Sequence, residues 1–265
     1  MKKDYIEDCH GGGETDFIER FWTARWAEKG INPADLRASD EWKAIKPFMD
    51  KLPANANILD AGCGTGEWTV WLAAMGHDVT GADISAATVA KLQAMFPGNK
   101  FIIADVRSLD AQDGSFNAVI SWGVFEHYEA GFGQPLKETL RMLKPGGYLF
   151  MSVPFHNPRH LIRDVLSDCF RRPPARPEQA HGKLRFYQWR MTRNELANEL
   201  LIAGFEVCGI RPIHVAQGIS RFLNLDLKLA SFPLLYRVAF KAARMTKPLF
   251  RPVSHMILAC ARKPE

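Results

Sequence analysis

A short apolar strand, a loop with three alternating glycines and a helix follow one another within residues 58–75, and this succession constrains the fold most. Asp60 closes the strand, and Gly62, Gly64 and Gly66 follow it. Glycine lets the backbone turn sharply and lets a ligand approach where a Cβ atom would obstruct it. The next helix presents free N–H groups and a partial positive charge at its N-terminus. The loop is therefore a candidate site for an anionic or electron-rich group, such as an amino acid carboxylate.

Strands and helices alternate along most of the chain after this loop. Apolar runs predict strands at residues 58–60, 77–82, 101–103, 116–121, 148–153, 205–210 and 255–261. Amphipathic segments predict the intervening helices at residues 67–75, 86–95, 136–143 and 192–203. Strands spaced by helices in this way form a parallel sheet with helices on both faces. The sequence therefore predicts an α/β fold, a Rossmann-like, doubly wound and mostly parallel sheet of seven strands.

The remaining segments predict additions to this sheet. Residues 14–52 carry apolar side chains at helical spacing, so residues 1–56 are expected to form an N-terminal helical cap. Residues 57–265 form the main domain, with insertions at 154–191 and 211–254. The first insertion is rich in proline and arginine and is expected to be a loop or lid. The whole is expected to be one compact domain.

Acidic residues end the second and third predicted strands, as Asp60 ends the first. Asp83 stands where a carboxylate can accept hydrogen bonds from both hydroxyls of a ribose. Asp105 is followed by Val106, a pair that can accept from an adenine amino group and flank the ring. The loop spacing also differs from the dinucleotide fingerprint G-x-G-x-x-G, which requires no preceding acid. These features favour an adenosine-bearing ligand other than a dinucleotide.

With these residues in place, the chain resembles the class I S-adenosylmethionine-dependent methyltransferases, in particular the bacterial small-molecule and lipid methyltransferases. The likeness rests on ILDAGCGTGEW, GADIS, IIADVRSL, SWGVFEHYE and RMLKPGGYLFMSVP, over about residues 57–153. It implies S-adenosyl-L-methionine as cofactor, with the three glycines at its methionine part, Asp83 at the ribose, and Asp105 and Val106 at adenine. Near the sulfonium it implies Ser121 and Trp122. The remaining cofactor-binding residues implied by these motifs are Asp60, Cys63 and Ile84.

The reaction implied by this resemblance is an in-line displacement, in which an O, N, S or C nucleophile attacks the methyl carbon. A hydroxyl acceptor would need a base to take its proton. His127, after the fourth strand, is the candidate catalytic residue, although a histidine at this place is as readily structural. His156, His181 and Tyr187 are weaker candidates, for which an ordinary loop role is favoured.

Several classes of site and acceptor lack sequence support. The five cysteines are scattered without a CxxC pair, so we expect no disulfide framework, metal site or iron–sulfur cluster. The motifs of amino-group and cytosine C5 nucleic-acid methyltransferases are absent, so nucleic acid is not the expected acceptor. Residues 1–10 lack the apolar core of a signal peptide, and no apolar run is long enough to span a bilayer. We therefore expect a cytoplasmic protein.

The second half of the chain is basic. Residues 156–265 hold 19 basic and 8 acidic residues, whereas residues 1–155 hold 15 and 21. Within it, residues 234–245 predict an amphipathic helix, with Arg237, Lys241 and Arg244 on one face and four apolar residues opposite: Leu234, Val238, Ala242 and Met245. Residues 234–251 could contact an anionic membrane periphery or an anionic, lipid-linked acceptor. The alternative is a cap helix packed on the fold with its basic face in water.

Two further questions stay open at the level of sequence. The aromatic N-terminal segment with Phe17, Phe21, Trp22 and Trp26 forms either a lid over the cofactor or helices packed on the sheet. The whole chain is a methyltransferase acting on a small-molecule, lipid or glycan-precursor acceptor, an NAD(P)-dependent oxidoreductase, or a non-catalytic adaptor that keeps the cofactor fold. The glycine spacing and Asp60 count against the oxidoreductase, and the intact acids count against the adaptor.

Overall fold

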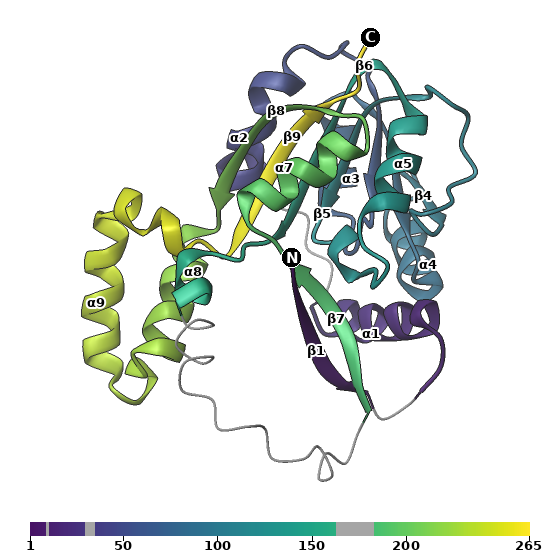
Figure 1. Ribbon diagram of the computed structural model, residues 1–265. Helices are drawn as coiled ribbons and strands as arrows, with labels where there is room; N and C mark the ends of the chain where they lie inside the picture. Colours follow the sequence, from purple (N-terminus) through teal and green to yellow (C-terminus); the bar gives the residue numbers. More distant parts are fainter. Residues whose placement is uncertain (9–10, 30–34, 163–182) are drawn as a thin grey trace.

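The computed structural model describes residues 1–8, 11–29, 35–162 and 183–265 of the chain (Figure 1). Its centre is a seven-stranded sheet in the order β4-β3-β2-β5-β6-β9-β8, in which β9 alone runs antiparallel to its neighbours. The seven strands are β2 (Asn57–Ala61), β3 (Asp78–Asp83), β4 (Lys100–Ile103), β5 (Phe116–Trp122), β6 (Leu143–Pro154), β8 (Glu206–Ile213) and β9 (Met256–Arg262). The predicted Rossmann-like sheet and its seven strands are confirmed.

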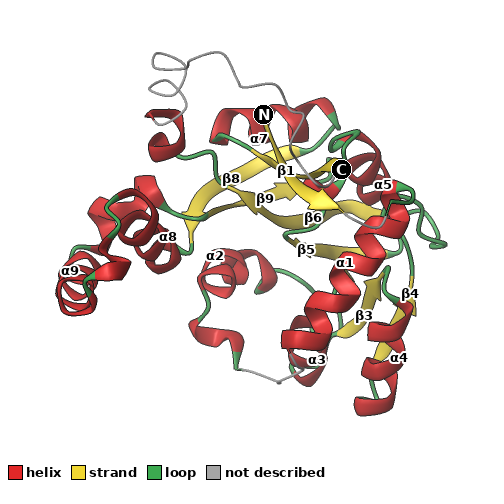
Figure 2. Ribbon diagram, turned by 90° about the horizontal axis from the view of Figure 1, so that it is seen from below, coloured by secondary structure: helices red, strands yellow, loops and turns green. Residues whose placement is uncertain are grey.

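Helices cover both faces of this sheet (Figure 2). On one face lie α2 (Asp40–Met49) and α3 (Glu67–Ala74), and on the other lie α5 (Gly133–Met142) and α7 (Arg193–Ile202). Alternate strand residues serve the two faces, so that Ile58 packs in the cluster of α2 and α3 and Leu59 in that of α5 and α7. A fifth helix beside the sheet, α4 (Ala86–Met95), is capped by Ser85 as predicted and packs on Phe101 of β4.

A second, two-stranded sheet joins segments far apart in sequence, and the sequence analysis predicted neither strand. It pairs β1 (Lys2–Asp8) with β7 (Lys183–Arg190) in antiparallel register. The pairing is supported by charge, because Asp4 contacts Arg190 at 2.8 Å and Asp8 contacts Arg185 at 2.9 Å. Charged strands of this kind lack the apolar alternation that indicates a strand. The expected loop at 154–191 therefore contains a strand in its described part.

The predicted N-terminal helices are present, and the first of them crosses the carboxyl edge of the main sheet (Figure 1). This helix, α1 (Glu14–Lys29), buries Phe17 and Ile18 in the core cluster of α5 and α7. A short helical turn, η1 (Leu36–Ala38), precedes α2. The first half of the aromatic segment thus packs on the fold, which is one of its two expected roles, and the lid over the cofactor stays a prediction.

The predicted insertion at 211–254 forms a helical lobe beside the sheet (Figure 1). We call residues 215–254 the helical lobe. It contains α8 (Val215–Arg221), η3 (Phe222–Asp226), η4 (Leu229–Ser231), α9 (Pro233–Met245) and η5 (Lys247–Val253). An apolar cluster of its own holds it together, built around Ile219, Leu223 and Ala243. Within the residues that the structure describes, no helix is long and apolar enough to cross a membrane.

Asp8 should hold α1 against the two-stranded sheet. Its carboxylate, only 6% exposed, accepts a hydrogen bond from Arg20 of α1 at 3.1 Å and one from Arg185 of β7 at 2.9 Å. We expect Asp8→Asn to lower the free energy of unfolding by about 1–3 kcal/mol, because two charge-assisted hydrogen bonds weaken together. Hydrogen–deuterium exchange should accelerate in α1.

The matched control for this substitution is Asp50→Asn, which removes an exposed ion pair with Lys46. It should change the stability by less than about 0.5 kcal/mol. Unchanged exchange in α1 of the Asp8→Asn protein would show that this carboxylate does not position the helix.

Candidate active site

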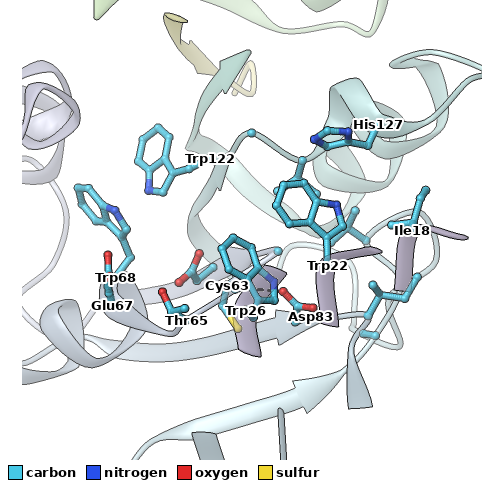
Figure 3. Close-up of a pocket in the computed structure, with 18 of the residues that line it drawn as sticks. Ile18, Trp22, Trp26, Cys63, Thr65, Glu67, Trp68, Asp83, Trp122 and His127 are labelled. Carbon is cyan, nitrogen blue, oxygen red and sulfur yellow. Dashed lines mark hydrogen bonds between the residues drawn. The ribbon is translucent and has the colours of Figure 1, made fainter. Parts of the chain in front are cut away.

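A pocket opens at the carboxyl ends of β2, β3 and β5, beneath α1 (Figure 3). This is the edge at which open α/β sheets bind ligands. Most of the cofactor-binding residues predicted from the sequence line it, namely Asp60, Gly62, Cys63, Gly64, Asp83, Ile84, Val106 and Trp122. His127 lines it as well. The remaining lining residues are Ile18, Trp22, Trp26, Lys29, Glu41, Thr65, Glu67, Trp68, Ala104, Gly123, Val124 and Tyr128.

The glycine loop forms the floor of this pocket in a conformation that depends on glycine. Gly62 and Gly64 have φ angles of +81° and +53°, which L residues with side chains rarely adopt. A Cβ atom on Gly64 would lie 2.8 Å from the Trp26 ring, and one on Gly62 would collide with Val124. The missing side chains therefore leave room for Trp26 and Val124 to pack directly on the loop.

Asp83 fixes the shape of the loop from the neighbouring strand. Its Oδ2 accepts a hydrogen bond from the Gly64 N–H at 2.8 Å, and its Oδ1 accepts one from the Ser85 N–H at 2.9 Å. Burial raises the pKa of Asp83, and the backbone donors oppose this only in part. The carboxylate is thus held at the pocket wall, where it can accept further hydrogen bonds from a ligand.

Asp60 is a second buried carboxylate at this wall. Its side chain accepts a hydrogen bond from the Thr69 hydroxyl at 2.7 Å. Burial raises the pKa of Asp60 to about 7, while the Thr69 hydroxyl lowers it and the nearby Asp83 raises it further. Because a carboxylate in this position gains from a positive charge beside it, the pocket favours a ligand with a cationic group.

Two tryptophans of α1 form the roof of the pocket. Figure 3 shows Trp22 and Trp26 projecting from α1 toward the glycine loop and Asp83. Their rings are stacked, with centroids 4.9 Å apart. The Trp22 ring also meets the His127 ring edge-on, with centroids 5.0 Å apart. The indole N–H groups of Trp26 and Trp122 are buried and have no hydrogen-bond partner within the described residues. Unpartnered donors at a pocket wall suit a ligand that brings acceptors.

His127 lines the pocket beside Trp22, in the short helical turn η2 (Phe125–His127). Its Nδ1 lies 2.7 Å from the Tyr187 carbonyl oxygen. A carbonyl can only accept, so Nδ1 carries the proton and Nε2 of the neutral ring is an acceptor. Burial lowers the pKa of His127 to about 4, despite the opposing hydrogen bond to Tyr187. The ring is therefore neutral at physiological pH.

Comparison with known proteins finds a methyltransferase domain in the middle of the chain. Residues 58–147 match a family model described as a methyltransferase domain. The chain is 38% identical over 113 residues to the 2-methyl-6-phytyl-1,4-hydroquinone methyltransferase of Synechocystis sp., a match covering 39% of this chain and 34% of that protein. It is 29% identical over 119 residues to a tRNA (carboxymethyluridine(34)-5-O)-methyltransferase of Arabidopsis thaliana, covering 43% and 28%.

A solved structure extends the likeness to the whole fold. The Burkholderia thailandensis 1,6-didemethyltoxoflavin-N1-methyltransferase, bound to its substrate and S-adenosylhomocysteine, superposes with a TM-score of 0.57. The comparison covers 100% of this chain and 96% of that one, at 18% identity, and so shows a shared fold. Residues 58–147 thus form a methyltransferase domain, and the relatives and the shared fold support an S-adenosylmethionine-dependent methyltransferase of class I. S-Adenosylmethionine is the cofactor of this class.

The described pocket residues fit this cofactor. The glycine loop lines the pocket, where its backbone can approach the methionine part, and Asp83 is placed as the hydrogen-bond acceptor expected for ribose. Ile84 and Val106 supply apolar walls on the same side. Asp60 offers its carboxylate near the loop, where the amino group and sulfonium of the cofactor would favour the ionised form.

Three predicted cofactor residues lie outside the pocket lining, so their ligand contacts stay predictions. Gly66 caps α3, and its missing side chain leaves room for Leu92 and Phe101. Ser121 is buried in β5 with no hydrogen-bond partner among the described residues. Asp105 is engaged by the guanidinium of Arg107, whose Nη2 lies 2.6 Å from Oδ2. Burial opposes ionisation of Asp105, but the hydrogen bonds from Arg107 lower its pKa below the ordinary value.

Sequence reasoning missed part of the wall and one buried acid. Trp68 and Glu41 enter the pocket from α3 and α2, and only the position of Trp68 after the glycine loop could have signalled this. Tyr128, directly after η2, lies at the mouth of the site as its place after the fourth strand predicts. Glu126 is 1% exposed, and its Oε2 has no partner among the residues described. Burial raises its pKa to about 8. Among the weaker base candidates, Tyr187 and His156 lie outside the pocket lining, and His181 lies outside the described residues.

Removal of the Asp83 carboxylate should weaken cofactor binding. We expect Asp83→Ala to raise the dissociation constant of S-adenosylhomocysteine at least about tenfold, or about 1.4 kcal/mol, because ribose donors and the Gly64 N–H lose their acceptor. Isothermal titration calorimetry measures this directly. The matched control is Asp78→Ala, at the amino end of the same strand, which should bind as the native protein does. Equal affinity of both variants would count against the ribose assignment.

Glu126 should make stability depend on pH. Its folded pKa of about 8 exceeds the ordinary 4.5, so between these pH values the unfolded chain gives up a proton that the folded protein keeps. The contribution of Glu126 to the free energy of unfolding is therefore fully present below about pH 4.5, and it is lost as the pH rises toward 8. Urea unfolding at pH 5 and pH 8 should show a smaller loss for Glu126→Gln, by on the order of a few kcal/mol.

The control for this measurement is Glu28→Gln, an exposed position on α1. It should reproduce the native loss of stability between the two pH values. The carboxylates of Asp60 and Asp83 contribute to the slope in all three proteins and cancel from the differences. A Glu126→Gln protein with the native pH slope would show that Glu126 ionises normally in the fold.

Proposed function

We propose that the protein transfers a methyl group from S-adenosylmethionine to a small-molecule or lipid acceptor with an aromatic or apolar body. The cofactor supplies an electrophilic methyl group on a positively charged sulfur, so that the protein mainly has to align the two substrates and exclude water. The observation that carries the proposal is the meeting of the glycine floor, Asp60 and Asp83 with an aromatic wall in one pocket.

The aromatic wall supports the nature of the acceptor. Trp22, Trp122 and Tyr128 line the pocket together with His127 and present flat apolar surfaces. Such surfaces favour a planar or apolar molecule over a strongly hydrated one. The similarity to a hydroquinone methyltransferase agrees with an aromatic acceptor that carries hydroxyl groups.

His127 is the residue proposed to hold and deprotonate such a hydroxyl. Its Nδ1 proton is committed to the Tyr187 carbonyl, so the unprotonated Nε2 is the atom that can accept the acceptor's proton. A base with a pKa near 4 is weak. It is sufficient here, because an oxygen becomes strongly acidic as it gains a bond to the methyl carbon. Proton transfer then accompanies methyl transfer and need not precede it.

Binding measurements separate this function from the two alternatives. We expect S-adenosylhomocysteine to bind with micromolar or better affinity in calorimetry and to raise the melting temperature, and NAD(P) to do neither. Tight NAD(P) binding without S-adenosylhomocysteine binding would establish an oxidoreductase. Cofactor binding without methyl transfer to any of a panel of hydroquinones, phenols and heterocyclic amines, followed with methyl-labelled cofactor, would favour the adaptor.

Substitution of His127 should impair turnover without impairing cofactor binding. We expect His127→Ala to lower kcat by about 10²–10⁴-fold with a hydroxyl acceptor, the range typical for loss of a general base. S-Adenosylhomocysteine affinity should change less than about threefold. In the native protein, kcat/KM should fall on acidification near pH 4, the lowered pKa of His127, and stay level through pH 6.5.

His77→Ala is the control histidine variant, because His77 precedes β3 at the opposite edge of the sheet. It should keep the native kcat. Full activity of the His127→Ala protein would remove His127 from the reaction, while leaving the proposed methyl transfer intact.

A further inference from the structure

The helical lobe stands at the same edge of the sheet as the pocket. It is inserted between β8 and β9, and because β9 is antiparallel to both β6 and β8, β8 ends at the edge where β2 and β5 end. His214, directly before the lobe, contacts Glu41 of the pocket wall at 2.6 Å. Whatever the lobe binds is therefore brought to the side of the molecule on which the pocket lies.

The inner face of α9 differs from both faces expected from its sequence. Tyr236, Ala239, Phe240 and Ala243 recur at helical spacing and pack in the cluster with α8. The predicted basic and apolar sets both lie on the outward side. At about 100° per residue, Arg237, Lys241 and Arg244 form a stripe directly beside the apolar stripe, and not opposite to it.

The apolar stripe of α9 lies in solvent. Leu234 is 77% exposed, Val238 59% and Met245 79%. The lobe exposes further apolar side chains, namely Leu225, Leu227, Phe232, Leu235 and Leu249. The alternative of a packed helix with its basic face in water thus holds for the aromatic side of α9, but the apolar residues expected opposite the basic face do not pack. An exposed apolar surface of this kind marks an interaction site.

The charge of the lobe is almost purely basic. It holds seven basic residues and one acid, Asp226, whose carboxylate is bound by Arg159 at 2.6 Å. Arg237, Lys241, Arg244 and Arg251 are exposed, and none of them forms an ion pair within the described part of the chain. The partner that matches this surface carries negative charge at its edge and apolar material beneath.

We propose that the helical lobe docks on an anionic phospholipid bilayer. The apolar stripe enters the boundary between headgroups and acyl chains, and the adjacent basic stripe contacts the phosphates. A nucleic acid would use the basic stripe but would leave the exposed Leu234, Val238 and Met245 without a partner. If the proposed function holds, this docking sets the pocket at a surface from which a membrane-dissolved acceptor is drawn.

Vesicle flotation of the full-length protein tests the docking. We expect the protein to float with vesicles of phosphatidylcholine and phosphatidylglycerol at low salt, and at least tenfold less with phosphatidylcholine alone. Salt at about 0.5 M should reduce binding strongly, since it screens the basic stripe. No flotation with anionic vesicles at low salt overturns the proposal.

Two variants and a control distinguish the stripes. We expect the triple substitution Leu234→Ser, Val238→Ser and Met245→Ser to lower anionic-vesicle binding at least tenfold, and the triple substitution Arg237→Gln, Lys241→Gln and Arg244→Gln to do the same. The control removes three exposed charges elsewhere, through Lys43→Gln, Lys91→Gln and Lys137→Gln, and should bind as the native protein does. An equal loss of vesicle binding in the control would show that net charge alone causes the effect, and would overturn the proposal.

Competition with tRNA separates a bilayer from a nucleic acid. Tight tRNA binding that depends on the basic stripe and is unchanged in the serine variant would assign the lobe to nucleic acid and overturn the proposal. Each variant should bind S-adenosylhomocysteine with native affinity, which shows that it is folded. Failure of flotation with intact cofactor binding thus refutes the docking alone, whereas loss of cofactor binding in the native protein refutes the proposed function.

Discussion

The site depends on two carboxylates, Asp60 and Asp83, that end adjacent parallel strands and are both buried. Each pays a desolvation cost that its protein partners offset only in part, and their proximity raises the pKa of Asp60 further. The donors that do help are those of the loop, because the Gly64 N–H points at Asp83. The positive φ angles of the loop glycines thus serve the buried carboxylate of Asp83 as well as a bound ligand. What the loop cannot supply is positive charge, and this is the property that a sulfonium-bearing amino acid brings.

The aromatic roof depends in turn on contacts between segments distant in sequence. Thr23 of α1 lies 2.6 Å from the Ser85 hydroxyl that caps α4, and Lys29 lies 3.5 Å from Glu67 beside the glycine loop. Arg107 joins Glu14 at the start of α1, at 2.7 Å, to Asp105 after β4. Asp105 therefore serves to anchor the roof in the structure, and any contact that it makes with adenine has to share a carboxylate already held by a guanidinium. The helix that covers the pocket is held by polar contacts at both ends, so Trp22 and Trp26 are fixed over it.

The sequence was sufficient for the central sheet and most of the pocket floor because both are encoded locally. A buried strand, a turn and a helix N-terminus place Asp60, Gly62 and Asp83 without reference to the rest of the chain. The strands β1 and β7 could not be predicted, since they are charged and pair across about 180 residues through ion pairs that leave no periodic signal. The burial of Glu126 was equally hidden, because it follows from the packing of η2 under β7 and not from its neighbours in sequence.

The helical lobe shows why periodicity alone misassigned a helix face. Three stripes run along α9, and the sequence distinguishes charged from apolar residues but not which apolar stripe finds a partner. The aromatic stripe with Tyr236 and Phe240 packs inward because α8 offers it a matching cluster, and the aliphatic stripe is left outside. Exposed leucine and methionine side chains lose about 25 cal/mol of hydrophobic stabilisation for each Å² of apolar surface that burial would take out of water. On the proposed docking, a bilayer recovers that energy at the same edge where the aromatic pocket opens, so an apolar acceptor would move between two apolar environments on one side of the protein.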